Sequence, residues 1–264
     1  MRVRCGGEGS EVWRLRLCPS EPEGSILIDE EGVDALAQIL ERAGASPTCR
    51  VLVLEGQPGR FCTGMDLGQV MGSGADLSSQ VQRFAGCLEA LRQGPQVVLA
   101  AVDGDVAGGG VGLAAAADLL LATETSSFSL PELSLGLLPA VVLPILLERM
   151  PSQRARRLCL FDSVDAGTAR ELGLVDQLAA TPDALERGLR AAIKVALRRS
   201  PAAVAALKAL QHQITGMPRA KALRLGASRT ASMLQSEQTL ASVRAFLDGE
   251  SLPWFSRYRP GSES

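Results

Sequence analysis

Short apolar runs alternate with amphipathic segments along the first part of the chain. Residues 50–55 (RVLVLE) and 97–102 (VVLAAV) are largely apolar and bounded by turn residues, which predicts two buried strands. Residues 30–42 carry apolar side chains at helical spacing after acidic residues, which predicts a helix. Residues 11–18 alternate loosely and predict a further strand, and residues 78–93 predict a second helix.

Three consecutive glycines follow the strand predicted over residues 97–102. This run, residues 108–110, opens a helix of small residues that we predict over residues 111–121. Beyond it we predict a short strand over residues 127–130 and an apolar helix over residues 140–149. Strands and helices in this order imply right-handed βαβ units, so the expected fold class is α/β with a mainly parallel sheet.

The C-terminal third of the chain has a different pattern. It is almost wholly helical, with breaks at Pro201, at residues 216–218 and at Gly249. We therefore divide the chain into a core of residues 1–180 and a C-terminal helical region of residues 181–264.

Composition excludes several classes of protein. The 264 residues are 46% hydrophobic and carry a net charge of −2, so no basic excess indicates nucleic acid, although a local basic patch stays compatible with this balance. No apolar run reaches the roughly 18 residues of a membrane span. Residues 1–10 lack the apolar core of a signal peptide, and we expect a cytoplasmic protein.

The cysteines and the single histidine argue against a metal site. Six cysteines are scattered without a C-x-x-C pair, and His212 is the one histidine. We expect free thiols in a reducing cytoplasm, no metal and no cofactor.

The motif FCTGMDL, residues 61–67, follows a predicted strand. Gly64 permits a left-handed backbone turn, which can leave the amide of Met65 pointing into a cavity. The alternative is an ordinary turn between a strand and a helix. Asp66 has two interpretations as well: it assists proton transfer at a site, or it binds nearby backbone amides as aspartates do in turns.

The glycine run at residues 108–110 lets a ligand approach the backbone closely. The helix that follows offers free amides and a partial positive charge, so an anionic group such as an enolate oxygen is favoured there. A phosphate loop is a poor alternative, because no Gly-Lys-Ser/Thr follows the run.

Glu132 lies after a proline in the apolar segment SLPELSLGLLP. It is either a first-turn residue that faces solvent or a buried catalytic acid. In the second case desolvation would raise its pKa and suit it to proton transfer near neutral pH.

Together these motifs resemble the crotonase superfamily, also called the enoyl-CoA hydratase/isomerase family. The resemblance covers nearly the whole chain and rests on RVLVLEGQPGRFCTGMDL, on AVDGDVAGGGVGLAAAADLLLATETSSFSLPELSLGLLP and on DAGTARELGLVDQL. It implies a spiral of βα or ββα turns with a C-terminal helical region for trimerisation and active-site cover. Members usually assemble as trimers or dimers of trimers.

The resemblance also implies roles for particular residues. The amides of Met65 and Gly109 correspond to the oxyanion hole, which holds the thioester oxygen as charge develops on it. Glu132 matches the second of the two catalytic glutamates, and we take Asp66 as a second catalytic candidate. The residues expected to line the acyl pocket are Gly64, Gly108, Gly110, Gly112, Leu137 and Ala140.

The sequence departs from the hydratase pattern at two places, which narrows the resemblance to a subfamily. The first hydratase glutamate falls on Gly112, and PAVVLP (residues 139–144) replaces a glycine-rich stretch. These features are similar to the dehydratases of polyketide β-branching cassettes. That subfamily removes water from a 3-hydroxy-3-methylglutaryl group on an acyl carrier protein and gives a 3-methylglutaconyl thioester.

One carboxylate suffices for this reaction if the proton and the hydroxyl leave from the same face. Glu132 would take the C2 proton and then protonate the departing hydroxyl. Two alternatives stay open: a hydratase or isomerase acting on a CoA thioester, and a non-catalytic thioester-binding scaffold. Retention of Glu132 and of both glycine turns argues against the scaffold.

The expected carrier of the acyl group is phosphopantetheine, on an acyl carrier protein or in CoA. Charged residues of the predicted helices, including Arg83 and Lys208, are either solvated helix charges or contacts for that carrier.

Overall fold

In the middle of the chain, successive strands alternate between two sheets. The computed structural model describes residues 1–68, 77–161 and 163–258. The larger sheet is formed by β1 (Arg2–Gly6), β2 (Val12–Cys18), β3 (Val51–Glu55), β5 (Val97–Val102), β7 (Leu119–Thr123) and β10 (Gln177–Ala179), in this spatial order. The smaller sheet is formed by β4 (Arg60–Cys62), β6 (Asp105–Ala107), β8 (Ser127–Ser129) and β9 (Val164–Asp165).

Each turn of the spiral therefore gives one strand to each sheet. β3 continues into β4, β5 into β6 and β7 into β8. Pairing along both sheets is parallel, except that β1 runs antiparallel to β2 and β9 antiparallel to β8. This confirms the expected α/β fold with ββα turns and a mainly parallel sheet.

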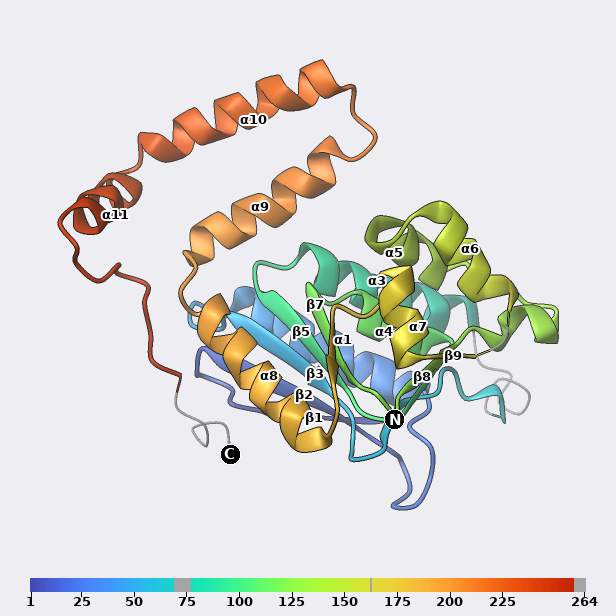
Figure 1. Cartoon of the computed structure of the whole chain (residues 1–264). Helices are drawn as coiled ribbons and strands as arrows, with labels where there is room; N and C mark the ends of the chain where they lie inside the picture. The colour runs from blue at the N-terminus through green and yellow to red at the C-terminus, as the bar shows by residue number, and fades with distance from the viewer. Residues whose placement is uncertain (69–76, 162, 259–264) are drawn as a thin grey trace.

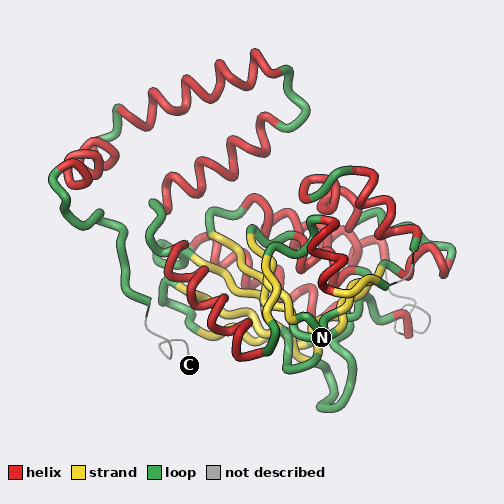
Figure 2. The backbone as a smooth tube through the Cα atoms, viewed as in Figure 1, coloured by secondary structure: helices red, strands yellow, loops and turns green. Residues whose placement is uncertain are grey.

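Helices cover both faces of the larger sheet (Figures 1 and 2). The helices of the spiral are α1 (Glu30–Ala45), α3 (Leu77–Gln93), α4 (Gly109–Ala115), η1 (Pro131–Leu135, a 3-10 helix), α5 (Val142–Arg149), α6 (Ser152–Leu160), α7 (Ala166–Leu172) and α8 (Pro182–Ala196). One large apolar cluster lies between the sheet and the helices α1, α3 and α4, and α8 closes a smaller cluster on the other face.

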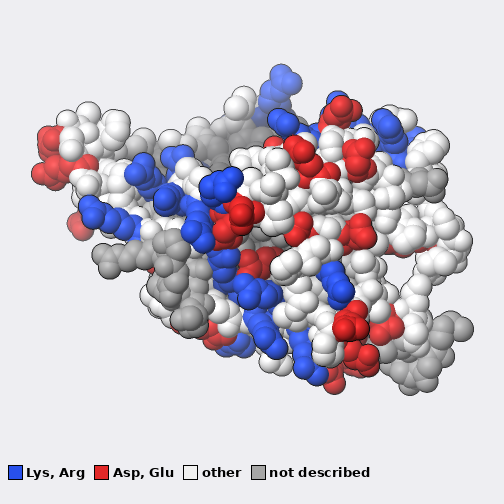
Figure 3. Space-filling model, turned by 60° about the horizontal axis from the view of Figure 1, so that its bottom comes forward, with Lys and Arg blue, Asp and Glu red and all other residues white. Residues whose placement is uncertain are grey.

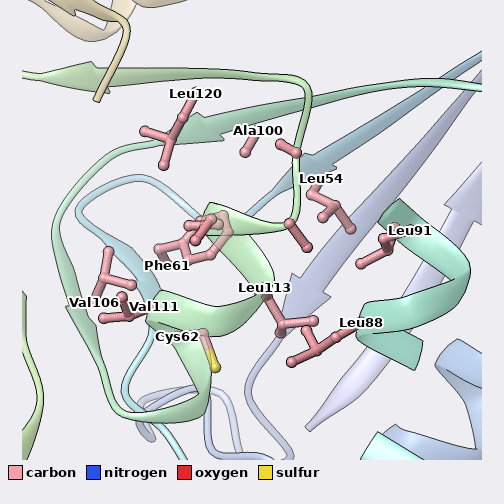
Figure 4. Close-up of a cluster of buried hydrophobic side chains, with 14 of the residues drawn as sticks. Leu54, Phe61, Cys62, Leu88, Leu91, Ala100, Val106, Val111, Leu113 and Leu120 are labelled. Atoms are coloured by element: carbon pink, nitrogen blue, oxygen red, sulfur yellow. The ribbon is translucent and has the colours of Figure 1, made fainter. Parts of the chain in front are cut away.

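The large cluster joins the two sheets to the helices. Phe61 of β4 is fully buried and lies among side chains of β5, β6 and β7, and Leu113 of α4 faces Leu88 of α3 (Figure 4). Because these side chains come from successive turns of the spiral, the same packing that forms the core also fixes the ends of β4 and β6.

Most of the predicted elements match the structure within a few residues. The prediction of one helix was wrong. The helix expected over residues 111–121 begins at Gly109 and ends at Ala115, and Leu119–Thr123 form β7. Leucines and alanines suit a helix locally, but here β7 pairs with β5 and β10. Sheet pairing therefore overrides helix propensity at this point. The polar segment at the N-terminus contains the edge strand β1, which the sequence pattern did not predict.

Three further helices form a helical arm, whose first helix packs on α3. They are α9 (Pro201–Ile214), α10 (Arg219–Leu234) and α11 (Glu237–Leu247), drawn in orange and red in Figure 1. Against the described part of the chain, α10 buries none of its residues. The boundary predicted at 180/181 falls between β10 and α8. Among the helices that the structure describes, none combines the length and apolar character needed to cross a membrane.

Arg50 anchors both ends of the helical arm. Its Nη2 donates to the carbonyl oxygens of Leu197 and Arg199, at 2.9 and 2.8 Å, just before α9. Its Nη1 donates to the carbonyl oxygen of Trp254 at 2.8 Å, after α11, and to Glu11 at 2.6 Å. A single guanidinium therefore holds the start and the end of the arm against the sheet.

We expect Arg50→Met to loosen both ends of the arm, because a methionine keeps the apolar stem and removes every donor. Hydrogen bonds from charged groups contribute about 1.5–3 kcal/mol each, so the free energy of unfolding should fall by about 2 kcal/mol or more. Amide exchange of residues 252–258 should accelerate. The control is Arg42→Met, which breaks an exposed ion pair with Glu8 and should cost less than about 1 kcal/mol. Equal effects of the two variants would contradict the anchor.

Candidate active site

The turn after β4 exposes one backbone amide. Gly64 has φ +93°, in the left-handed region that favours glycine, and a Cβ there would lie 3.1 Å from the carbonyl oxygen of Ala107. Its carbonyl accepts from the Ile28 amide at 2.7 Å, and the Asp66 amide donates to the Ile28 carbonyl at 2.9 Å. Between these two bonds, the Met65 amide has no acceptor within the described part of the chain.

A second turn, after β6, exposes another amide. Gly108 has φ +51°, and its amide donates to the carbonyl of Ser129 at 3.0 Å. Gly109 is the first residue of α4, so its amide has no acceptor in the helix, and none of the other described residues supplies one. A Cβ on Gly108 would lie 3.6 Å from the Cα of Gly64, so the two turns are in contact.

Glu132 lies against the Gly108 turn. It is the second residue of η1, where Pro131 occupies the first position. A Cβ on Gly108 would lie 3.3 Å from Glu132 Oε1. Glu132 Oε2 is buried and has no hydrogen-bond partner among the described residues. Desolvation by burial, which outweighs a backbone hydrogen bond, raises the pKa of this carboxyl above the ordinary value of a glutamate.

A cavity of about 360 Å³ joins the three features. Its walls come from the Gly64 and Gly108 turns, α3, η1 and the segment that leads into α5. Apolar side chains make most of the described lining, among them Ile28, Leu67, Val81, Phe84, Leu138 and Val142. Leu135, Leu137 and Leu138 are more than half exposed at its rim. The arrangement thus places one carboxyl and two unpaired amides in an apolar cavity.

The structure brings most of the predicted site residues to this cavity. Those that line it are Gly64, Met65, Gly108, Gly109, Glu132, Leu137 and Ala140. Glu132 stands in the first turn of η1, but its side chain lines the cavity and its Oε2 is buried, so the solvent-facing interpretation does not hold.

Three predicted residues lie outside the described lining. Asp66 Oδ1 accepts from the Gly68 amide at 3.0 Å, as aspartates do in turns. Gly110 packs on β4, where an added Cβ would lie 2.1 Å from the carbonyl oxygen of Cys62. Gly112 is covered by apolar side chains, and an added Cβ would meet Val142 and Leu88 at 3.1 and 3.2 Å. At position 112, where the family resemblance places the first hydratase glutamate, Val142 and Leu88 therefore occupy the space that a side chain would need.

Some lining residues were not predicted from the sequence. Val81 and Phe84 are spaced as neighbours on one face of α3, which is a signal for a shared surface but not for a cavity. Thr63 belongs to the FCTGMDL motif and lines the cavity. Ile28 precedes α1 by sequence and reaches the cavity through its pairing with Met65.

Other chemically active side chains have structural roles. Burial raises the pKa of the Cys62 thiol to about 11, which argues against a nucleophile. The six cysteines, all within the described ranges, are free. Lys208 is buried and donates to two backbone carbonyls and Asp118, so the expectation of a solvated or carrier-binding lysine was wrong. Arg83 pairs with Glu30 and Asp34 of α1.

Comparison with known proteins agrees with this geometry. Residues 20–257 match the family model described as enoyl-CoA hydratase/isomerase. The chain is 32% identical over 241 residues to the bacillaene synthase dehydratase PksH of Bacillus subtilis, which covers 88% of this chain and 90% of that protein. It is 30% identical over 214 residues to the enoyl-CoA hydratase ACTT6 of Alternaria alternata, with 79% and 71% covered.

The fold has close relatives among solved structures. An enoyl-CoA hydratase/isomerase from Marinobacter aquaeolei superimposes with a TM-score of 0.86 at 27% identity, over 96% of this chain and 99% of that one.

The raised pKa of Glu132 predicts a pH-dependent gain in stability for Glu132→Gln. A folded-state pKa above the unfolded value stabilises the fold below about pH 4.3, and this contribution is lost as pH rises through the folded pKa. Glutamine stays neutral, so the variant should be more stable than the wild type at pH 7, with the difference shrinking near pH 4. Urea unfolding at both values measures this.

The control for this prediction is Glu21→Gln, at an exposed position in the loop before α1. It should show no comparable gain at pH 7. A Glu132→Gln variant that is no more stable than the wild type at pH 7 would contradict the desolvation of the carboxyl.

Proposed function

Because the chain belongs to the enoyl-CoA hydratase/isomerase family, the crotonase superfamily, we propose that it dehydrates a 3-hydroxyacyl thioester through an enolate bound at the Met65 and Gly109 amides. It is a hydro-lyase of the dehydratase and hydratase type. The observation that carries the proposal is the position of Glu132, whose carboxyl lies against the Gly108 turn in the cavity that also holds the unpaired amides of Met65 and Gly109.

The two amides supply the electrostatic part of the mechanism. The thioester oxygen accepts from Met65 and Gly109, and both bonds strengthen as the oxygen gains charge. Removal of one such donor typically costs about 2.7–4 kcal/mol of transition-state stabilisation. The apolar lining strengthens the effect, because few groups in the cavity screen the charge.

Glu132 supplies the proton transfers. Its carboxylate takes a proton from C2, and the electron pair of that bond forms the enolate. The protonated carboxyl then gives the proton to the C3 hydroxyl, the C3–O bond breaks, and the enolate electrons form the C2=C3 double bond. The unpaired Oε2 and the raised pKa of Glu132 support this cycle near neutral pH. Leu88 and Val142 fill the space at Gly112, so one carboxyl serves both steps.

The proposed substrate is the 3-hydroxy-3-methylglutaryl group on the phosphopantetheine of an acyl carrier protein, and the product is a 3-methylglutaconyl thioester. The identity to the bacillaene synthase dehydratase supports it. The described lining has no lysine, arginine or histidine. Burial of an unpaired carboxylate is costly, so the terminal carboxylate of this group would lie at the open rim.

An acidic carrier protein would find complementary charge on the molecule. Figure 3 shows lysine and arginine side chains in a band across one face, despite the net charge of −2. Such local fields speed the encounter with an oppositely charged partner.

A CoA-linked hydratase is the second candidate function. It is favoured by the 30% identity to an enoyl-CoA hydratase and by the shared pantetheine arm of both carriers. The cavity accepts an apolar enoyl chain without any unpaired charge.

Mass spectrometry of a carrier protein loaded with the 3-hydroxy-3-methylglutaryl group tests the first candidate. We expect the loss of one water from the acyl group, with at least about a hundredfold slower loss for Glu132→Gln, because general acid–base catalysis contributes roughly 10²–10⁴-fold. A parallel reaction uses short enoyl-CoA thioesters. Hydration of these without any mass loss on the carrier-bound group would favour the CoA-linked hydratase, and near-wild-type dehydration by Glu132→Gln would exclude the mechanism.

We also propose that the helical arm packs on other copies of the chain, in a trimer or a dimer of trimers. Large apolar side chains of the arm are exposed, among them Leu207, Leu223, Leu234, Phe246 and Leu247. Apolar surface of this extent favours burial against a partner. None of the arm's residues lines the cavity described here, so any cover from the arm would come from another copy.

Charged substitutions on the arm should dissociate the assembly. We expect Leu223→Glu combined with Phe246→Glu to shift sedimentation from the oligomer to a smaller species, because each buried leucine or phenylalanine contributes about 1.5–3 kcal/mol. Gln38→Glu, at an exposed position of α1, adds charge elsewhere and should leave the oligomer intact. Unchanged sedimentation of the double variant would contradict assembly through the arm.

A further inference from the structure

The cavity has two side chains with oxygen atoms in its described lining, Glu132 and Thr63. Both contribute a buried oxygen without a hydrogen-bond partner among the described residues, Oε2 of Glu132 and Oγ1 of Thr63. The backbone of Thr63 is held in place, because its amide donates to the carbonyl of Ile26 at 3.0 Å. Since Gly64 follows directly, Thr63 lies beside the turn that exposes the Met65 amide.

A buried hydroxyl without a partner is unfavourable by about 1–3 kcal/mol. Valine has nearly the same shape as threonine and would fill the same space without this cost. Buried polar groups are nearly always hydrogen-bonded, so the unpaired Oγ1 points to a polar group that enters the cavity with the substrate. The catalytic carboxyl is the only other oxygen-bearing side chain in the described lining.

We propose that the Thr63 hydroxyl binds the oxygen on C3 of the substrate, as the leaving hydroxyl in dehydration and as the attacking water in the reverse reaction. This inference rests on the proposed dehydratase function and adds a residue to it. Thr63 stays neutral and donates a hydrogen bond to the oxygen that departs. The proton that completes the water comes from Glu132, and the C3–O bonding electrons leave with the oxygen.

Neither Asp66 nor position 112 offers a side-chain donor to the cavity. Asp66 accepts from the Gly68 amide and lies outside the lining. Position 112 is covered by Val142 and Leu88. The hydroxyl of Thr63 is therefore the neutral side-chain donor that the described lining offers to orient the C3 oxygen against Glu132. Glu132 needs that oxygen within hydrogen-bond distance to protonate it.

Two variants separate this role from packing. Thr63→Val removes the hydroxyl and keeps the shape, and Thr63→Ser keeps the hydroxyl. Dehydration of the carrier-bound 3-hydroxy-3-methylglutaryl group is measured for each, by mass spectrometry. In parallel, exchange of the C2 protons with deuterated water is measured on the 3-methylglutaryl thioester, which lacks the C3 hydroxyl and needs only the enolate site and Glu132.

We expect Thr63→Val to lower kcat for dehydration about tenfold or more, consistent with the loss of one buried hydrogen bond. Thr63→Ser should stay within a few-fold of the wild type, and both variants should exchange C2 protons at the wild-type rate.

Three results overturn the inference. Wild-type dehydration by Thr63→Val would show that the hydroxyl does not act on the C3 oxygen. Equal loss of dehydration and of exchange in both variants would show a packing role. A wild-type enzyme that exchanges C2 protons but removes no water from the carrier-bound group or from 3-hydroxyacyl-CoA thioesters would reject the dehydratase function itself, and the role of Thr63 with it.

Discussion

The close approach of α4 to the end of β4 is the constraint on which the site depends. Gly110 lies so near the carbonyl of Cys62 that an added Cβ would be 2.1 Å from it. This contact brings the turn at Gly108 against the turn at Gly64, so that two amides from distant parts of the sequence share one cavity. Any side chain at position 110 would separate the turns, because the atom it meets belongs to the backbone and cannot rotate away.

Glu132 is held at this junction under an energetic conflict. Its pKa is raised by burial, so its charged form is destabilised in the folded protein. The η1 helix that carries Glu132 contributes little to the core, because none of its residues is fully buried and its leucines remain exposed. Glu132 lowers the stability of the fold and is central to the proposed chemistry. Such a trade-off between stability and activity is common at functional sites.

The sequence predicted the frame of the fold better than the detail of the site. Residues 51–54 and 98–102 are buried throughout, so the pattern of these apolar runs has one interpretation. Residues 119–123 were assigned to a helix because their composition suits both elements, and pairing with β5 and β10 decides between them. Long-range pairing of this kind is invisible to a local pattern.

The same limit applies within the site. The two glycine turns and Glu132 were predicted because their motifs are specific, and they meet at the cavity. Gly110 and Gly112 were grouped with them on the family resemblance, but helix geometry turns both toward the core. Thr63 has no signal of its own in the sequence. Its unpaired hydroxyl is evident only once the cavity is known, because Glu132 supplies the other oxygen-bearing side chain of the described lining.

The guanidinium of Arg50 has a consequence for assembly. A helical segment of about fifty residues that is fixed at both ends is a closed loop, and a closed loop has far fewer conformations than a free tail. Much of the entropy that a free tail would lose on docking is therefore already lost in the single chain. The arm is preorganised, so the packing on other copies proposed above would carry little further entropic cost.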